Sequence, residues 1–201
     1  DVMDRRLRVR FTGKLERQIQ FWQQTQSDPH GIANAVLASL YSVRDAITKS
    51  ANYLAVNTQS NAGNHGFNLI GKYPRASFVC LDAPEARLAV GDQYADAEGL
   101  AAQLNSWGRD RIIVTDGRGG SVAISEGIAR RIPALTSKVL DTMGAGDAFL
   151  SVTAPLSLVA SDMEAVAFVG NIVGAIKVGT IGHRAPVDKE TVLRHVGTML
   201  K

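Results

Sequence analysis

The sequence predicts a layered α/β domain with a largely parallel sheet. Short apolar runs typical of buried strands alternate with stretches of helical spacing along most of the 201 residues. Glycine-rich turns follow two of these runs, and no repeat or low-complexity linker divides the chain. Hydrophobic residues make up 45% and charged residues 20%, which excludes a disordered or fibrous chain.

The first half of the chain supplies helices and strands in alternation. Apolar residues alternate with arginines over 6–11, which predicts a strand with one solvated face, and 14–26 suits a polar helix. Apolar residues three or four apart over 32–49 predict an amphipathic helix. Apolar runs at 53–57 and 77–81 are typical of buried strands.

The second half is expected to continue this alternation. Helices should begin near residues 84, 97, 162 and 188, with Asp96 capping the second of them. Strands are expected over 111–115 and 121–124, separated by a glycine-rich turn at 117–120. Pro155 should end or kink the helical run that follows Asp147.

Composition and charge exclude several functions. A net charge of +3 with 6% aromatic residues argues against a nucleic-acid partner. No run of 18 uncharged apolar residues is present, so no membrane partner is expected. The single cysteine, Cys80, lies in a predicted buried strand, which favours a structural thiol and the cytoplasm as compartment. The scattered histidines lack metal-ligand spacing.

The segment Asp141–Phe149 carries the clearest chemistry, with the sequence Asp-Thr-Met-Gly-Ala-Gly-Asp-Ala-Phe. Gly144, Ala145 and Gly146 lack bulk and stand at a predicted helix start, where unpaired N–H groups favour an anion such as phosphate. Asp147 falls in the first turn, where a carboxylate can accept a proton from an attacking hydroxyl. Taken without its flanks, the pattern also suits a plain glycine turn followed by a helix acid.

The uninterrupted string resembles the signature of the ribokinase (PfkB) family of carbohydrate kinases. The resemblance implies a ribokinase-like three-layer α/β/α fold and phosphorylation of a sugar or sugar phosphate by ATP with Mg²⁺. It makes Asp147 the catalytic base and Gly144, Ala145 and Gly146 the anion hole. Within the family, the strand with Arg8 and Arg10, the helix after it and 178–182 are similar to the sugar kinases of the ADP-heptose pathway.

The same resemblance assigns roles to other nucleotide-binding residues. Thr115, Gly117 and Gly120 match the strand and glycine turn that approach the nucleotide phosphates, although an ordinary hairpin would give the same local pattern. Asn171 matches the helix asparagine near the adenine. Its alternative role is that of a polar helix residue facing solvent.

Three acidic residues are implied at the metal sites. Asp82 and Glu85 resemble an Asn-x-x-Glu motif near the Mg²⁺ and the phosphates, with aspartate in place of asparagine. Glu85 is the expected Mg²⁺ residue, and its alternative role is that of a first-turn helix acid. Asp141 matches a position that helps to hold a monovalent cation, such as K⁺, in the family.

The resemblance also shapes the expected domain organisation. We expect residues 1–201 to form a single incomplete ribokinase-like domain, in which 1–31 follow the lid and 32–201 form the nucleotide-binding core. The N-terminal part of the family fold, with its Gly-Gly sugar-binding signature, has no counterpart in the sequence. Two alternatives therefore stay open: a non-catalytic nucleotide-binding or interaction protein, and a superfamily kinase for another small alcohol. A homodimer also stays open.

Overall fold

The computed structural model describes residues 32–60, 65–66, 68–136, 138–182 and 186–200. The strand and helix predicted within 1–31 lie outside these residues. The elements follow one another as one helix, two strands, two helices, three strands and three helices, with two short 3₁₀ turns. The turns are η1 (Ile70–Lys72) and η2 (Gly117–Gly119).

Five strands form a single mixed sheet in chain order. They are β1 (Ala55–Val56), β2 (Phe78–Asp82), β3 (Ile112–Thr115), β4 (Ser121–Ser125) and β5 (Ile128–Ile132). The pairs β1–β2 and β2–β3 are parallel, whereas β4 pairs antiparallel with both β3 and β5. Only β4 therefore runs against the other four strands, which confirms the largely parallel sheet.

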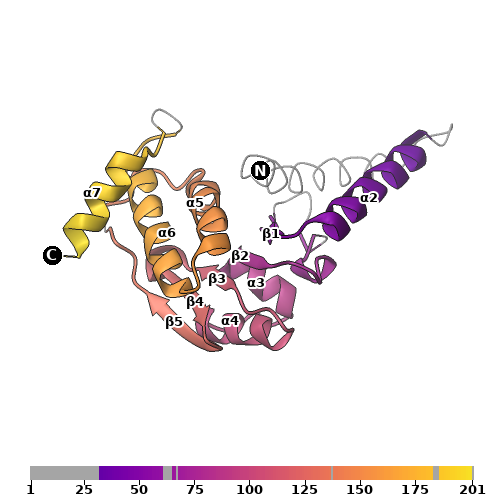
Figure 1. The fold of residues 1–201 in the computed structure, drawn as a ribbon, viewed down its shortest axis with the longest axis horizontal. Helices are drawn as coiled ribbons and strands as arrows, with labels where there is room; N and C mark the ends of the chain where they lie inside the picture. The colour runs from indigo at the N-terminus through magenta and orange to yellow at the C-terminus, as the bar shows by residue number, and fades with distance from the viewer. Residues whose placement is uncertain (1–31, 61–64, 67, 137, 183–185, 201) are drawn as a thin grey trace.

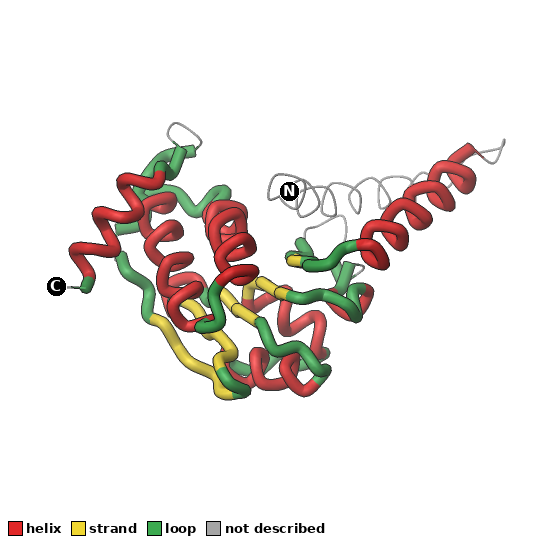
Figure 2. The backbone as a smooth tube through the Cα atoms, in the orientation of Figure 1, coloured by secondary structure: helices red, strands yellow, loops and turns green. Residues whose placement is uncertain are grey.

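Helices cover both faces of the sheet, as Figures 1 and 2 show. One face carries α3 (Ala83–Val90) and α4 (Ala97–Ser106), and the other carries α5 (Ala145–Val159) and α6 (Met163–Val178). The helix α7 (Lys189–Met199) packs beside α6, while α2 (Ile32–Ser50) extends away from the sheet (Figure 1). The three-layer α/β/α architecture expected from the sequence is confirmed.

Strand alternation divides the buried side chains between two cores. In β2, Val79 and Leu81 pack with α3 and α4, whereas Phe78 and Cys80 pack with α5 and α6. Successive side chains of a strand point to opposite faces, so both cores are filled from the same short apolar run. Cys80 is buried with a free thiol, as expected. Burial, with the charges of Glu85 and Asp82, raises the pKa of this thiol.

Aspartates start four of the helices. Asp82, Asp96, Asp162 and Asp188 each accept a hydrogen bond from a first-turn backbone N–H of the helix that follows. The starts of α4, α6 and α7 lie within a residue of those predicted. Helix α5 starts differently, because Gly144 stands at its N-cap in a left-handed conformation with φ 73° and supplies no side-chain cap.

Two expectations about the second half of the chain need correction. The sequence patterns predict no strand over 128–132, yet these residues form β5 and pair with all of β4. Helix α5 does not end at Pro155 but continues to Val159. The carbonyl that loses its partner to proline belongs to Ser151, which lies on the exposed side of α5, where water can satisfy it.

Candidate active site

The start of α5 presents free amides beside an exposed carboxylate. Ala145 N donates to Thr142 O at 3.2 Å, and Ala148 N donates to Gly144 O at 3.0 Å. Within the described residues, the amides of Gly146 and Asp147 have no hydrogen-bond partner, and the Asp147 side chain is exposed. The positive end of the helix therefore offers two N–H donors to an anion, with Asp147 next to them.

The loop before α5 is fastened to the loop after α6. The two carboxylate oxygens of Asp141 accept N–H groups from Met143 at 2.9 Å and Gly182 at 2.7 Å. Leu140 N donates to Val178 O at 2.8 Å. The buried Lys177 ammonium donates to the carbonyl of Gly182. Asp141 and Lys177 thus hold the N–H and the C=O of the same residue.

Close packing between α5 and α6 fixes the position of the α5 start relative to α6. Gly170 lies against Phe149 and Thr153, and a Cβ at this position would be 2.5 Å from the Phe149 ring and 2.7 Å from Thr153 Cγ2. Only glycine allows this approach without a shift of one helix. Asn171 is the next residue of α6 after Gly170, so this packing also fixes the position of Asn171 relative to the start of α5.

The glycine turn after β3 connects β3 with the antiparallel strand β4. Thr115 is half-buried at the end of β3, and its Oγ1 lies 3.4 Å from the carbonyl of Leu81. Gly117 is exposed at the start of η2, whereas Gly120 is buried with φ 86°. A Cβ on Gly120 would lie 2.1 Å from the Ile132 carbonyl oxygen, so the turn is pressed against the end of β5.

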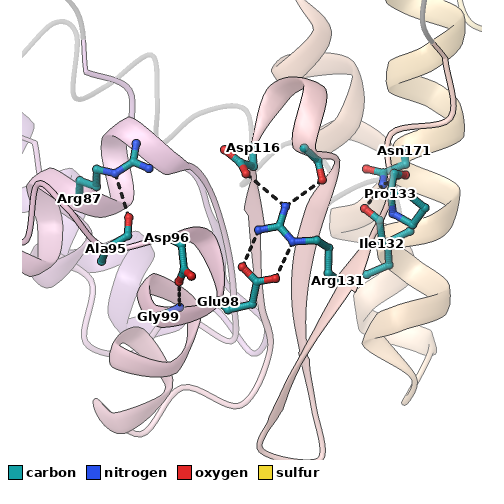
Figure 3. A network of polar contacts seen from close by, with 11 residues as sticks. Arg87, Ala95, Asp96, Glu98, Gly99, Asp116, Arg131, Ile132, Pro133 and Asn171 are labelled. Carbon is teal, nitrogen blue, oxygen red and sulfur yellow. Dashed lines mark hydrogen bonds and ion pairs between the residues drawn. The ribbon is translucent and has the colours of Figure 1, made fainter.

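Asn171 is buried, not solvent-facing. Its Nδ2 donates to the carbonyls of Ile132 at 3.0 Å and Pro133 at 2.9 Å, as Figure 3 shows. Both amide hydrogens therefore hold the end of β5. The same backbone contacts Gly120, so Asn171 and the glycine turn meet at one point although 50 residues of sequence lie between 120 and 171.

Asp82 and Glu85 form a capping box at the end of β2. Glu85 N donates to Asp82 Oδ1 at 2.7 Å, and Asp82 N donates to Glu85 Oε2 at 3.1 Å. Glu85 Oε1 accepts the N–H of Ser60 at 3.2 Å. Asp82 pairs in register with Thr115, which places this box beside the strand that leads into the glycine turn. Both residues line an open groove of about 680 Å³.

The buried carboxyl of Glu85 gives a testable pH dependence. Burial, and secondly the Asp82 charge, raise its pKa to about 7. Because the pKa of Glu85 is higher in the folded protein than in the unfolded chain, the protonated carboxyl favours the folded state. This contribution to stability is complete below about pH 4 and is lost as pH rises through 7. We expect this group to lower the free energy of unfolding by up to about 3 kcal/mol between pH 5 and 8.

Urea unfolding at a series of pH values measures this effect. Glu85→Gln cannot ionise and should lose most of the decrease, whereas Glu190→Gln, an exposed first-turn acid of α7, should keep it. Identical pH profiles for Glu85→Gln and the unmodified protein would contradict the assignment.

The structure joins some of the sequence-predicted residues but not all. Thr115, the glycine turn and Asn171 meet around the end of β5, and the Asp82 box adjoins Thr115. No hydrogen bond or ion pair between described residues joins Asp147 to this box. In the described part of the chain, no three His, Cys, Asp or Glu side chains gather as a metal site. None of the described helices is long and apolar enough to cross a membrane.

The sequence analysis missed the end of β5 as a supporting element. The turn before β5 consists of Glu126 and Gly127, both with positive φ, which is the geometry of a two-residue hairpin. The Glu126-Gly127 pair shortly after a predicted strand was the available signal. Arg131, on this strand, bonds to Glu98, Asp116 and the carbonyl of Gly119.

Fold and site together define a class of protein. A three-layer α/β/α core with a glycine turn after β3 and a glycine-started helix bearing an exposed aspartate is the arrangement that the resemblance to ribokinase-like kinases implies. The sequence profile of the pfkB family of carbohydrate kinases matches residues 31–190. The chain belongs to this family.

Relatives and solved structures agree with the family. The bifunctional protein HldE of Citrifermentans bemidjiense is 29% identical over 130 residues, which are 62% of this chain and 27% of HldE. Ribokinase from Thermotoga maritima superposes with a TM-score of 0.61 at 22% identity, over 76% of this chain and 52% of the ribokinase. Fructokinase from Vibrio cholerae, solved with fructose, ADP and potassium, gives a TM-score of 0.60 at 18% identity, over 78% and 54%. The chain thus spans about half the length of these solved kinases and about a quarter of HldE.

Proposed function

We propose that this chain transfers the γ-phosphoryl group of ATP to a hydroxyl of a sugar or sugar phosphate, with Asp147 as general base. The observation that supports this is the start of α5, where an exposed carboxylate adjoins two unpartnered amides. Family membership supports kinase chemistry, and the likeness to HldE and to a fructokinase solved with sugar and nucleotide supports a carbohydrate acceptor. The single cysteine, buried and free, suits a cytoplasmic compartment.

The proposed mechanism uses the residues at the α5 start. Asp147 accepts the proton of the acceptor hydroxyl as its oxygen bonds to the γ-phosphorus and the bond to the β-phosphate oxygen breaks. The N–H groups of Gly146 and Asp147 then face the charge that develops on the transferred group. Ala145 contributes by its small size, because its N–H donates to Thr142. Gly144 contributes the left-handed turn that starts the helix.

The chain's acidic groups fit Mg²⁺ better than K⁺. Mg²⁺ is commonly held by one or two carboxylates together with substrate phosphates and water, so it needs no larger cluster. Glu85, whose two oxygens each accept one N–H, retains lone pairs for this role, and Mg²⁺ would neutralise phosphate charge. Each oxygen of Asp141 likewise accepts one N–H, but the Lys177 ammonium, which donates to the carbonyl of Gly182, already brings positive charge to this loop and disfavours a further cation.

The proposal is tested by ADP release from the purified protein with ATP, Mg²⁺ and a panel of sugars and sugar phosphates. We expect release to depend on one carbohydrate class and thermal stability to rise with ATP and Mg²⁺. Stabilisation by nucleotide without ADP release for any acceptor would instead support a non-catalytic nucleotide-binding protein. Release only with nucleosides or vitamin alcohols would move the acceptor to another class of small alcohol.

A further inference from the structure

Arg131 connects three segments around the glycine turn. Its Nε and Nη2 donate to the two oxygens of Glu98 in the first turn of α4, each at 2.5 Å. Its Nη1 donates to Asp116 Oδ2 at 3.2 Å and to the Gly119 carbonyl at 2.9 Å. Figure 3 shows the guanidinium between these groups. A planar fork can make such contacts together, whereas a lysine ammonium cannot.

The contacts of Arg131 reach the turn directly. At Gly119 a Cβ would lie 2.5 Å from Asp116 Oδ2 and 3.0 Å from Arg131 Nη1, so a side chain there would displace these two groups. On the other side, Gly120 contacts the backbone that follows Arg131, which Asn171 holds. The turn therefore rests on β5 through a side chain at one point and through the main chain at another.

The turn keeps some of its amides free. Gly119 N donates to Asp116 O at 2.8 Å, and Gly120 N donates to Gly117 O at 3.2 Å. Among the described residues, the N–H groups of Gly117 and Arg118 have no partner. Two free donors at the end of a parallel strand can bind one anion together only while the turn keeps this conformation.

We infer that Arg131 is a positioning residue for the nucleotide, holding the turn Gly117–Gly119 so that its free amides meet the phosphates. This inference rests on the proposed function. Arg131 does not itself contact the reacting atoms, and its side chain is 37% exposed. An exposed ion pair alone would contribute little to folding, so the expected effect falls on nucleotide binding.

The test compares Arg131→Gln with Arg130→Gln, which removes the same charge from the neighbouring exposed residue of β5. Titration calorimetry with a non-hydrolysable ATP analogue and Mg²⁺ gives the Kd, and steady-state assays give KM for ATP, KM for the sugar, and kcat. For Arg131→Gln we expect Kd and KM for ATP to rise about tenfold, as for loss of a charged hydrogen bond. The sugar KM and kcat should stay within about twofold, and Arg130→Gln should match the unmodified protein.

Two further variants separate positioning from folding. Arg131→Lys should recover at most part of the nucleotide affinity, because one ammonium cannot bridge Glu98 and Gly119. Glu98→Gln removes the anchor of the guanidinium without touching the turn and should raise KM for ATP about threefold, a test that holds if Arg131→Gln does not fold. An unchanged nucleotide affinity in folded Arg131→Gln, or in Glu98→Gln, would overturn the inference. Failure of the unmodified protein to bind nucleotide would overturn the proposed function and the inference with it.

Discussion

Replacing Asp147 with asparagine is expected to lower kcat by roughly 10²- to 10⁴-fold while the Kd for ATP stays within a few-fold. The carboxylate is exposed in the first turn of α5, so its loss leaves both cores untouched. Asparagine keeps the size of the side chain but cannot take the proton of the acceptor hydroxyl. The affected quantity is therefore the rate of the chemical step, measured by ADP release at saturating ATP and sugar.

The matched control is Glu164→Gln, which removes an exposed first-turn acid from the neighbouring helix α6. It should leave kcat, the nucleotide Kd and the thermal midpoint unchanged. If Asp147→Asn turned over at the unmodified rate, Asp147 would not be the base. If instead nucleotide binding were lost, the side chain would serve to hold the nucleotide with its Mg²⁺ rather than to accept a proton.

Replacing Gly120 with alanine is expected to cost about 3 kcal/mol or more of unfolding free energy. The residue has φ 86° and ψ −126°, a conformation that side chains rarely adopt. The added Cβ would lie 2.1 Å from the Ile132 carbonyl oxygen and 2.6 Å from the backbone of the next two residues. All three contacting atoms belong to the main chain, so none of them can move aside as a side chain could. Urea unfolding measures the loss.

Gly127→Ala serves as the control for backbone conformation alone. Gly127 has φ 77° in the turn between β4 and β5, and nothing lies within 4 Å of its would-be Cβ. Left-handed strain without a clash should cost about 1 kcal/mol. Equal losses for the two variants would show that the contact with β5 contributes nothing, and that the turn can move away from Ile132.

Local signals were sufficient for most of the architecture. Successive residues of the apolar run at 77–81 point alternately into the two cores. The aspartates before α4, α6 and α7 mark the starts of these helices to within one position. Asp141–Phe149 predicted a glycine turn followed by a helix, and α5 begins inside this string. Strand alternation, helix caps and glycine turns are set by residues adjacent in sequence, so local patterns are enough to predict them.

The support of the site depends on long-range contacts and was not predictable in this way. Asn171 holds carbonyls of β5 that lie 38 and 39 positions earlier, and Arg131 reaches Glu98 across 33 positions. Nothing in the residues next to Asn171 indicates that its amide is committed to backbone. The capping box of Glu85 was foreseeable from Asp82, but the pKa of Glu85 is raised mainly by burial, which only the fold creates.

The contact of Gly170 with Phe149 has a mechanical consequence. The Phe149 ring of α5 occupies the space that a Cβ at position 170 of α6 would need. Because the two helices interlock here, they cannot slide past each other and must move as one rigid body. Asp147 and Asn171, the residue after Gly170, consequently keep a constant separation. Under the proposed function, any movement that brings ATP and the acceptor hydroxyl together therefore has to come from elements other than α5 and α6, because these two are fixed to each other.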